Sequence, residues 1–211
     1  MDGQTCSFMA YASTPSSRVE YCVNFADTVP SDFVSFVDIS KFEQRCKTGC
    51  PNFAHKWSCP PYAPRFQDFT EGWGHLTVVF LTVELGQFSY TKNDYLKIKA
   101  ANSILKSRAD RFLREMAPKV GRYITTGSCR LCKSCGCKTG QACSHPDKMS
   151  FSYEAMGMDV GALVEKVFGR DLMWYKRGQL PKDTSVVCGL LSKEPLSLEY
   201  LREEYRRVIG D

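Results

Sequence analysis

A run of closely spaced cysteines constrains what this chain can fold into more than any other feature of its sequence. Cys129, Cys132 and Cys135 are separated by two residues each, and Cys137 and Cys143 follow them. Thiols at this spacing can wrap a tight turn around one centre, as ferredoxin-type runs do around a cubane. Zinc sites more often pair two separated CxxC knuckles around one tetrahedral ion. The run therefore favours an iron–sulfur cluster, with zinc as the alternative.

A second group of cysteines lies earlier in the chain. Cys46 and Cys50 are four residues apart, Cys59 follows, and proline comes directly after both Cys50 and Cys59. Proline removes a backbone donor and stiffens the turn, as it often does after cluster cysteines. Residues 46–69 show no helical or strand period, so a long loop of this kind needs another organiser. A bound metal can supply the free energy that orders it.

The two cysteine-rich loops, residues 46–69 and 127–146, together predict the metal ligands. The candidate cofactor-binding residues are Cys46, Cys50, Cys59, Cys129, Cys132, Cys135 and Cys143, and Cys137 is added to these as a candidate metal ligand. Eight thiolates are the number that two [4Fe-4S] clusters need. One cluster with spare thiols also fits the set. So does one complete cluster beside a three-cysteine cluster, whose exposed iron could bind a substrate.

The cysteine content also indicates the compartment. Eleven cysteines in 211 residues are too many for packing alone, and their odd count and clustered spacing are unlike a secreted disulfide scaffold. With 43% hydrophobic residues the chain can bury a core without such staples. We therefore expect free thiols that bind metal in a reducing compartment, the cytoplasm.

The remaining composition argues against a membrane or nucleic-acid partner. Residues 1–17 have neither a basic n-region nor an apolar run, which predicts a mobile terminus that includes Cys6 and no signal peptide. No stretch approaches the roughly 18 apolar residues that span a bilayer. The formal charge of +5 is scattered rather than gathered into a basic tail. A weakly basic surface suits an acidic protein redox partner, and the oligomeric state stays open.

The periodicity of apolar residues predicts an α+β fold in a single domain over residues 1–211. Residues 75–85 are β-branched and almost continuously apolar, as in a central strand covered on both faces. Other strands are expected at residues 19–25, 123–126, 172–175 and 184–191, the last two as a hairpin, and helices at 40–45, 93–116, 159–168 and 197–209. Pro118 is expected to end the second helix. This order predicts a mixed or antiparallel sheet with helices packed on it.

Several side chains outside the ligand set also receive an interpretation. Cys22 and Cys188 lie in apolar strand patterns and are expected in the core. His145 is interpreted as a turn residue, with a ligand or proton donor as the alternative. Trp57 and Tyr62 are expected to shield the metal loop from water. Three cations beside the run either raise the reduction potential of a cluster or are merely solvated: Arg130, Lys133 and Lys138.

At these residues the chain resembles a family of uncharacterised, predicted metal-binding proteins from anaerobic bacteria and methanogenic archaea. The shared signature comprises Cys46-x3-Cys50-Pro51-Asn52-Phe53, Trp57-x-Cys59-Pro60-Pro61-Tyr62, Cys129-x2-Cys132-x2-Cys135, Cys143-x-His145-Pro146 and residues 152–160. Cys137 is an extra cysteine relative to the family pattern. The resemblance covers residues 40–165 and implies metal binding without implying a reaction.

Three functions fit the sequence. The first is an iron–sulfur electron carrier or redox accessory protein. The second is an enzyme that uses an open iron for sulfur or small-molecule chemistry. The third is a zinc-stabilised interaction module that docks through the basic helix face at residues 97–114. No Ser-His-Asp set, P-loop or dinucleotide fingerprint suggests another chemistry, and whether the protein is an enzyme stays open.

Overall fold

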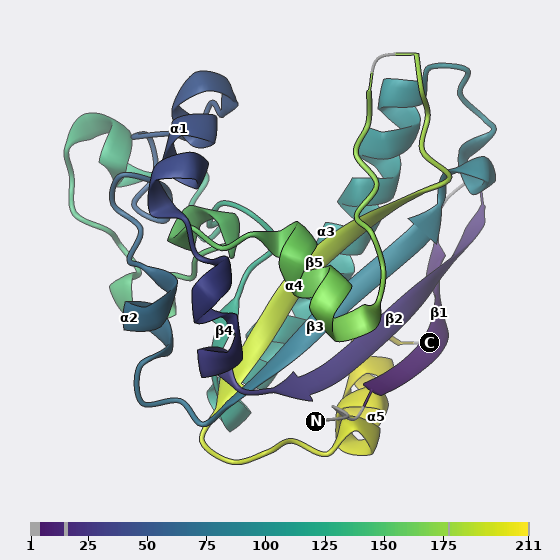
Figure 1. Cartoon of the computed structure of the whole chain (residues 1–211). Helices are drawn as coiled ribbons and strands as arrows, with labels where there is room; N and C mark the ends of the chain where they lie inside the picture. The colour runs from purple at the N-terminus through teal and green to yellow at the C-terminus, as the bar shows by residue number, and fades with distance from the viewer. Residues whose placement is uncertain (1–4, 15–16, 177, 211) are drawn as a thin grey trace.

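A central strand buried on both faces organises the molecule (Figure 1). The structure is a computed structural model that describes residues 5–14, 17–176 and 178–210. Its five-stranded antiparallel sheet has the order β1-β2-β3-β5-β4, with β1 at Thr5–Ser13, β2 at Arg18–Thr28, β3 at His75–Glu84, β4 at Gly121–Ile124 and β5 at Asp183–Ser192. Every side chain of β3 from Leu76 to Val83 is buried. The predicted α+β fold and central strand are confirmed.

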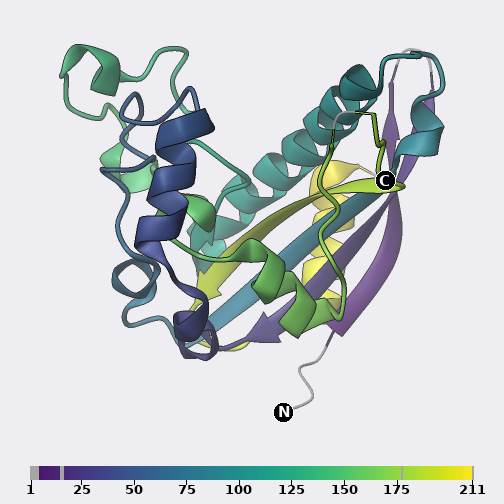
Figure 2. The same ribbon diagram turned by 45° about the horizontal axis from the view of Figure 1, so that its top comes forward.

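Helices cover both faces of this sheet (Figure 2). The helices α3 (Asp94–Val120) and α5 (Leu198–Ile209) pack on one face, where they share a core with β1, β2, β3 and β5. On the other face lie α4 (Val160–Phe168), α2 (Phe66–Thr70) and the 3₁₀ helix at Pro30–Phe36. The helix α1 (Ile39–Gly49) stands at one end of this second layer. The two helical layers bury the apolar side chains that β3 presents on each face of the sheet.

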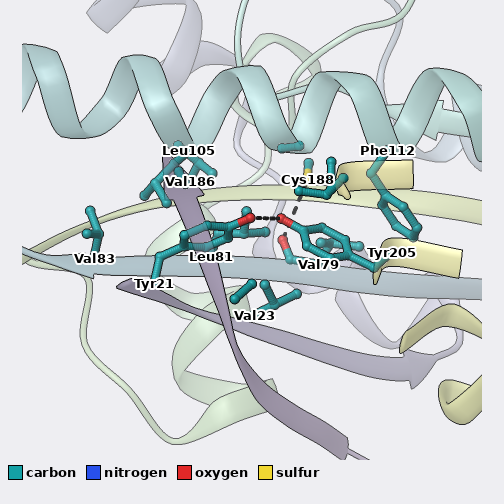
Figure 3. Packing of buried hydrophobic residues seen from close by; sticks show 14 of the residues in the cluster. Tyr21, Val23, Val79, Leu81, Val83, Leu105, Phe112, Val186, Cys188 and Tyr205 are labelled. Atoms are coloured by element: carbon teal, nitrogen blue, oxygen red, sulfur yellow. Dashed lines mark hydrogen bonds between the residues drawn. The ribbon is translucent and has the colours of Figure 1, made fainter. Parts of the chain in front are cut away.

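The core under α3 contains hydrogen-bonded polar atoms as well as apolar side chains. Figure 3 shows the hydroxyls of Tyr21 and Tyr205 meeting 3.0 Å apart. The thiol of Cys188 is fully buried and donates to the carbonyl oxygen of Val79 at 3.7 Å, so its predicted core position is confirmed. Cys22 is only half-buried, because the two-residue period of β2 turns it away from the buried Tyr21 and Val23.

The structure corrects the prediction for the N-terminal segment and for the strand at residues 172–175. Residues 5–13 form β1, which pairs with β2 along its whole length, while residues 1–4 and 15–16 lie outside the described part. The buried Ala10 and Ala12 are too small to give a strong sequence period. Residues 172–175 form no strand. Instead β5 pairs with β3 and β4, so the expected hairpin does not exist.

Two helix boundaries also differ from the prediction. Asp38 caps α1, which continues through Cys46 to Gly49, so the loop expected from residue 46 begins one turn later. Asn93 caps α3 at the start of the expected helix, but Pro118 lies inside the last turn and the helix ends at Val120, with Gly121 as its C-cap. Gly121 has φ of 150°, and a Cβ there would lie 2.4 Å from the Leu191 carbonyl oxygen. Only glycine fits this close approach.

None of the helices in the described ranges combines the length and apolar character needed to cross a membrane.

The chain after the second cysteine-rich loop is fixed to the sheet by Tyr153. This side chain is fully buried, and its hydroxyl donates to the Cys188 carbonyl oxygen at 3.4 Å. It reaches β5 because Gly189 has no side chain there. A Cβ on Gly189 would lie 2.5 Å from the Tyr153 hydroxyl.

Gly189→Ala should therefore destabilise the protein by about 1–3 kcal/mol, because either Tyr153 or β5 must shift. The free energy of unfolding in urea measures this effect. Gly86→Ala is the matched control, since a Cβ there meets nothing within 4 Å. Equal stability of the two variants would contradict the close packing of Tyr153 on β5.

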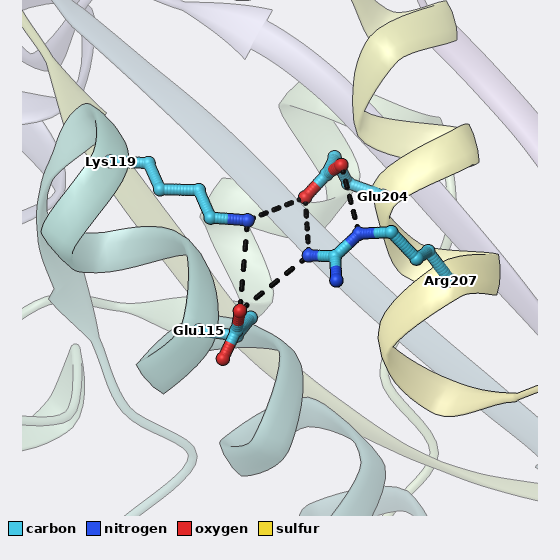
Figure 4. Close-up of polar contacts among 4 residues, drawn as sticks. All are labelled: Glu115, Lys119, Glu204 and Arg207. Atoms are coloured by element: carbon cyan, nitrogen blue, oxygen red, sulfur yellow. Dashed lines mark hydrogen bonds and ion pairs between the residues drawn. The ribbon is translucent and has the colours of Figure 1, made fainter.

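A group of four charged side chains joins α3 to α5 (Figure 4). Glu204 accepts from Lys119 at 2.8 Å and from two nitrogens of Arg207 at 2.8 and 3.1 Å. Glu115 lies 3.7 Å from Lys119 and 3.5 Å from Arg207. The hydrogen bonds from Arg207 and Lys119 lower the pKa of Glu204 to about 2.

Glu204→Gln should reduce stability at neutral pH more than in acid. A carboxylate whose folded pKa of about 2 lies below its ordinary 4.5 contributes stability above pH 4.5, and this contribution is lost as the pH falls toward 2. Urea unfolding of wild type and variant between about pH 7 and pH 2.5 measures the difference, which should shrink across this window. Glu203→Gln, on the same helix and without an ion pair in the described part of the chain, is the control. A difference independent of pH would argue against the network.

Candidate metal centre

Four of the predicted ligands lie around one hollow. Cys129, Cys132, Cys135 and Cys143 line it together with Trp57, Ser58, Leu131, His145 and Met149. The thiols belong to the segment after β4, which consists of bends, extended residues and two short 3₁₀ helices, Gly136–Thr139 and Pro146–Lys148. The spacing of Cys129, Cys132 and Cys135 thus brings them to one centre, and Cys143 returns to it from farther along the chain.

Three other predicted ligands form a second group at the end of α1. Cys46 and Cys50 are one helical turn apart, and the Cys50 amide donates to the Cys46 carbonyl oxygen at 3.0 Å. Cys59 is buried in the turn that follows. Burial, with smaller contributions from the nearby thiols of Cys50 and Cys46, raises the pKa of the Cys59 thiol to about 11, although a hydrogen bond with Ser58 and the charge of Lys56 act against this rise. These three thiols are therefore within electrostatic reach of one another.

Two carboxylates also lie near the Cys46 thiol. Burial is the largest cause that raises the pKa of this thiol, and the negative charges of Cys50, Glu154 and Glu43 add to it in decreasing order. Glu154 belongs to the short 3₁₀ helix Glu154–Met156, which contacts α1. Because metals bind the thiolate, loading this group must release protons from Cys46 and Cys59, whose thiol pKa values are raised.

Hydrogen bonds join the two cysteine-rich loops to each other. Lys56 Nζ donates to the Cys129 carbonyl oxygen at 2.9 Å, and Trp57 Nε1 donates to the Gln141 carbonyl oxygen at 2.9 Å. The Cys129 amide donates to Ser58 Oγ at 2.9 Å. Figures 1 and 2 both show the segments side by side at one end of the molecule. The two groups of thiols thus belong to one composite unit.

The base of the second loop is closed where it leaves and rejoins the sheet. The Thr125 amide donates to the Phe151 carbonyl oxygen at 2.9 Å, and Ser150 Oγ donates to the Tyr123 carbonyl oxygen. Together with the buried Tyr153, these bonds hold both ends of the loop beside β4 and β5.

The model of one protein family, described as predicted metal-binding protein (DUF2284), matches residues 35–191. The chain belongs to this family. The match spans α1, both cysteine-rich loops and nearly all of β5. No curated protein and no solved structure matched the chain. Membership of DUF2284 supports metal binding and does not specify which metal is bound.

Cys137, the extra cysteine, lies beside the hollow rather than among its lining residues. Its thiol is buried and donates to the Ala54 carbonyl oxygen at 3.5 Å. Ala54 belongs to the first loop, so this contact adds another link between the loops.

The structure also places the other residues that were singled out near the cysteines. Trp57 lines the hollow, while the half-exposed Tyr62 packs edge-on against Trp57 with ring centroids 4.7 Å apart. His145 lies at the hollow and begins a 3₁₀ turn. Arg130 lies 3.6 Å from Asp110. Lys133 and Lys138 are exposed.

The donor set fits a thiolate-bound group. The side chains that line the hollow offer four thiols and no carboxylate. Among residues 5–14, 17–176 and 178–210, no three His, Cys, Asp or Glu side chains are close enough to hold a single metal ion. Either the thiols bind something larger than one ion, or the loops contract around one.

Sequence reasoning missed the residues that hold the loops in place. Lys56 and Ser58 flank Trp57 and carry no motif of their own. The position of Ser58 immediately before Cys59 is the one available signal, and it does not reveal that Cys129 is the partner.

Ser58→Ala tests the link between the loops. Because Ser58 is buried, the variant leaves the Cys129 amide without this acceptor, which should cost about 1–3 kcal/mol and speed metal loss. Urea unfolding and the metal retained after dialysis against a chelator measure the two effects. Ser134→Ala, an exposed serine of the same loop, should change neither. Similar metal loss from both variants would show that the Ser58 bond does not support the site.

Proposed function

We propose that this protein is an iron–sulfur redox protein, an electron carrier or an accessory subunit. The observation that carries the proposal is the convergence of Cys129, Cys132, Cys135 and Cys143 on one hollow. Four thiolates are the complete ligand set of a [4Fe-4S] cluster, and the Cys129–Cys135 spacing is typical of ferredoxin-type runs. When bound, such a cluster supplies one-electron transfer.

The surroundings of the four thiols support a redox role over a purely structural one. Trp57, Leu131 and Met149 give the hollow an apolar wall, and solvent exclusion is one of the ways in which proteins tune a cluster's potential. The cations Lys133 and Lys138 are exposed on the same loop. They suit an acidic protein partner, and reduced thiols suit the cytoplasm.

The three-cysteine group supports a second candidate, an enzyme with an open iron. Cys46, Cys50 and Cys59 provide one thiolate fewer than a cubane needs, so the fourth iron would be free for a substrate. Glu154, near Cys46, also lines a cavity of about 340 Å³ beside β5. Lys106 lines the same cavity. Burial, and after it the positive charge of Arg130, lowers the pKa of the Lys106 amine. The link between this cavity and the three-cysteine group is Glu154, since none of the three cysteines is among the described residues that line the cavity.

Metal analysis of matched cysteine variants tests the proposal. Anaerobically purified wild type should hold about eight irons and eight sulfides if both groups carry cubanes. The double variant Cys132→Ala/Cys135→Ala and the single variant Cys50→Ala should each lose about half of the iron, because each leaves only two thiols in one of the two groups. Cys188→Ala, which removes the buried core thiol, should keep all of it. Zinc without sulfide would contradict the redox function and favour an interaction module.

Electron paramagnetic resonance of the same reduced samples separates the two candidates. An open iron should respond to an added thiol ligand in the Cys132→Ala/Cys135→Ala protein, where only the three-cysteine group keeps all of its thiols. A spectrum that does not change would remove the basis of the enzyme candidate. It would leave the electron carrier intact.

A further inference from the structure

A second cavity adjoins the four-cysteine hollow on the side facing α3. It has a volume of about 430 Å³ and lies between the end of α3, β4 and the second cysteine-rich loop. This volume falls within the range of small-molecule sites. Phe69, Pro118, Leu131 and Met149 supply an apolar wall.

The cavity carries an excess of positive charge. Arg114, Arg122 and Lys148 line it, and Asp147 is the one acidic residue among its described lining. None of the three cations forms an ion pair with a carboxylate in the described part of the chain. Cations beside a low-dielectric wall attract anions more strongly than cations in open water do.

One of the three cations contacts an aromatic ring instead of an acid. The Arg122 guanidinium lies over the Phe69 ring, 4.2 Å from its centroid. Arg114 lines the cavity together with Tyr123, whose hydroxyl donates to the Lys148 carbonyl oxygen at 3.3 Å. Arg122 is therefore positioned by its ring contact, and both guanidinium groups have donors that a carboxylate or phosphate can accept from.

Two residues separate the cavity from the four-cysteine hollow. The side chains of Leu131 and Met149 line both the cavity and the hollow. The sulfur of Met149 lies 4.0 Å from the sulfur of Cys143. A molecule in the cavity would thus be separated from the thiols by a single layer of side chains.

We propose that this cavity binds a small organic anion, with an aromatic or other apolar body and a carboxylate or phosphate group, beside the four-cysteine centre. The apolar wall selects the body and the guanidinium groups select the anion. The proposal rests on the proposed function only for the nature of the neighbouring centre. The binding itself depends on the cavity.

Equilibrium dialysis of the full-length, metal-loaded protein tests the proposal, with radiolabelled benzoate and phenyl phosphate as probes. At least one of the two should bind saturably at one site per chain. Benzyl alcohol, which lacks the charge, and inorganic phosphate, which lacks the apolar body, should each bind at least tenfold more weakly. Saturable binding of neither aromatic anion would overturn the proposal.

Arginine variants locate the site. Arg114→Gln and Arg122→Gln should each weaken binding of the aromatic anion at least tenfold. Arg111→Gln removes the same charge from the exposed face of α3, outside the cavity, and should leave binding unchanged. An equal loss in all three variants would show attraction by the general surface charge and would also overturn the proposal.

The metal content of the same samples keeps this test separate from the proposed function. Zinc in place of iron and sulfide would contradict the redox function, but saturable, Arg114-dependent binding in the same samples would still support the anion site. Full iron content without anion binding would support the redox function and contradict the anion site.

Discussion

The burial of β3 on both faces is the constraint on which the rest of the structure depends. A strand with no solvent-facing side needs a helical layer on each side, and α3 with α5 supplies one while α4 and α2 supply the other. Apart from α2, which adds Phe66 and Phe69 to the second layer, the cysteine-rich segments contribute no residue to the buried core of either layer. They are therefore placed at one end of the sheet, where each depends on the other for its hydrogen bonds.

The parts of the fold that follow from local periodicity could be predicted from the sequence. The apolar run at residues 75–85 predicted the central strand, and Asn93 and Asp159 indicated where α3 and α4 begin. Both signals can be read from sequence because a strand period or a helix cap depends on neighbouring residues. The strand β1 was missed since its inward residues include Ala10 and Ala12. The apolar residues 172–175 were mistaken for a strand because an exposed Met173 and Trp174 look the same in sequence as buried ones.

In the candidate site, too, local sequence signals could be predicted and long-range contacts could not. The cysteine spacing indicated the seven positions that the structure gathers into a group of four and a group of three. How the cysteines divide between the two groups is set by the path of the chain in space. So are the partners of Lys56, Trp57 and Ser58, which lie more than seventy residues away in the other loop. Spacing alone cannot supply such contacts, and the family match to DUF2284 supports metal binding without specifying the metal.

The hydrogen bonds between the loops also affect whether metal binding by one group of thiols favours metal binding by the other. Each loop lacks regular structure over most of its length, so holding metal costs it conformational entropy. When one loop is ordered, Ser58 and Trp57 present fixed partners to the other, which then has less freedom left to lose. If both groups hold metal, their occupancy is thus coupled, and by linkage the coupling is the same in both directions. Partly filled molecules are then rarer than independent sites would give, and the protein tends toward two states, empty and full.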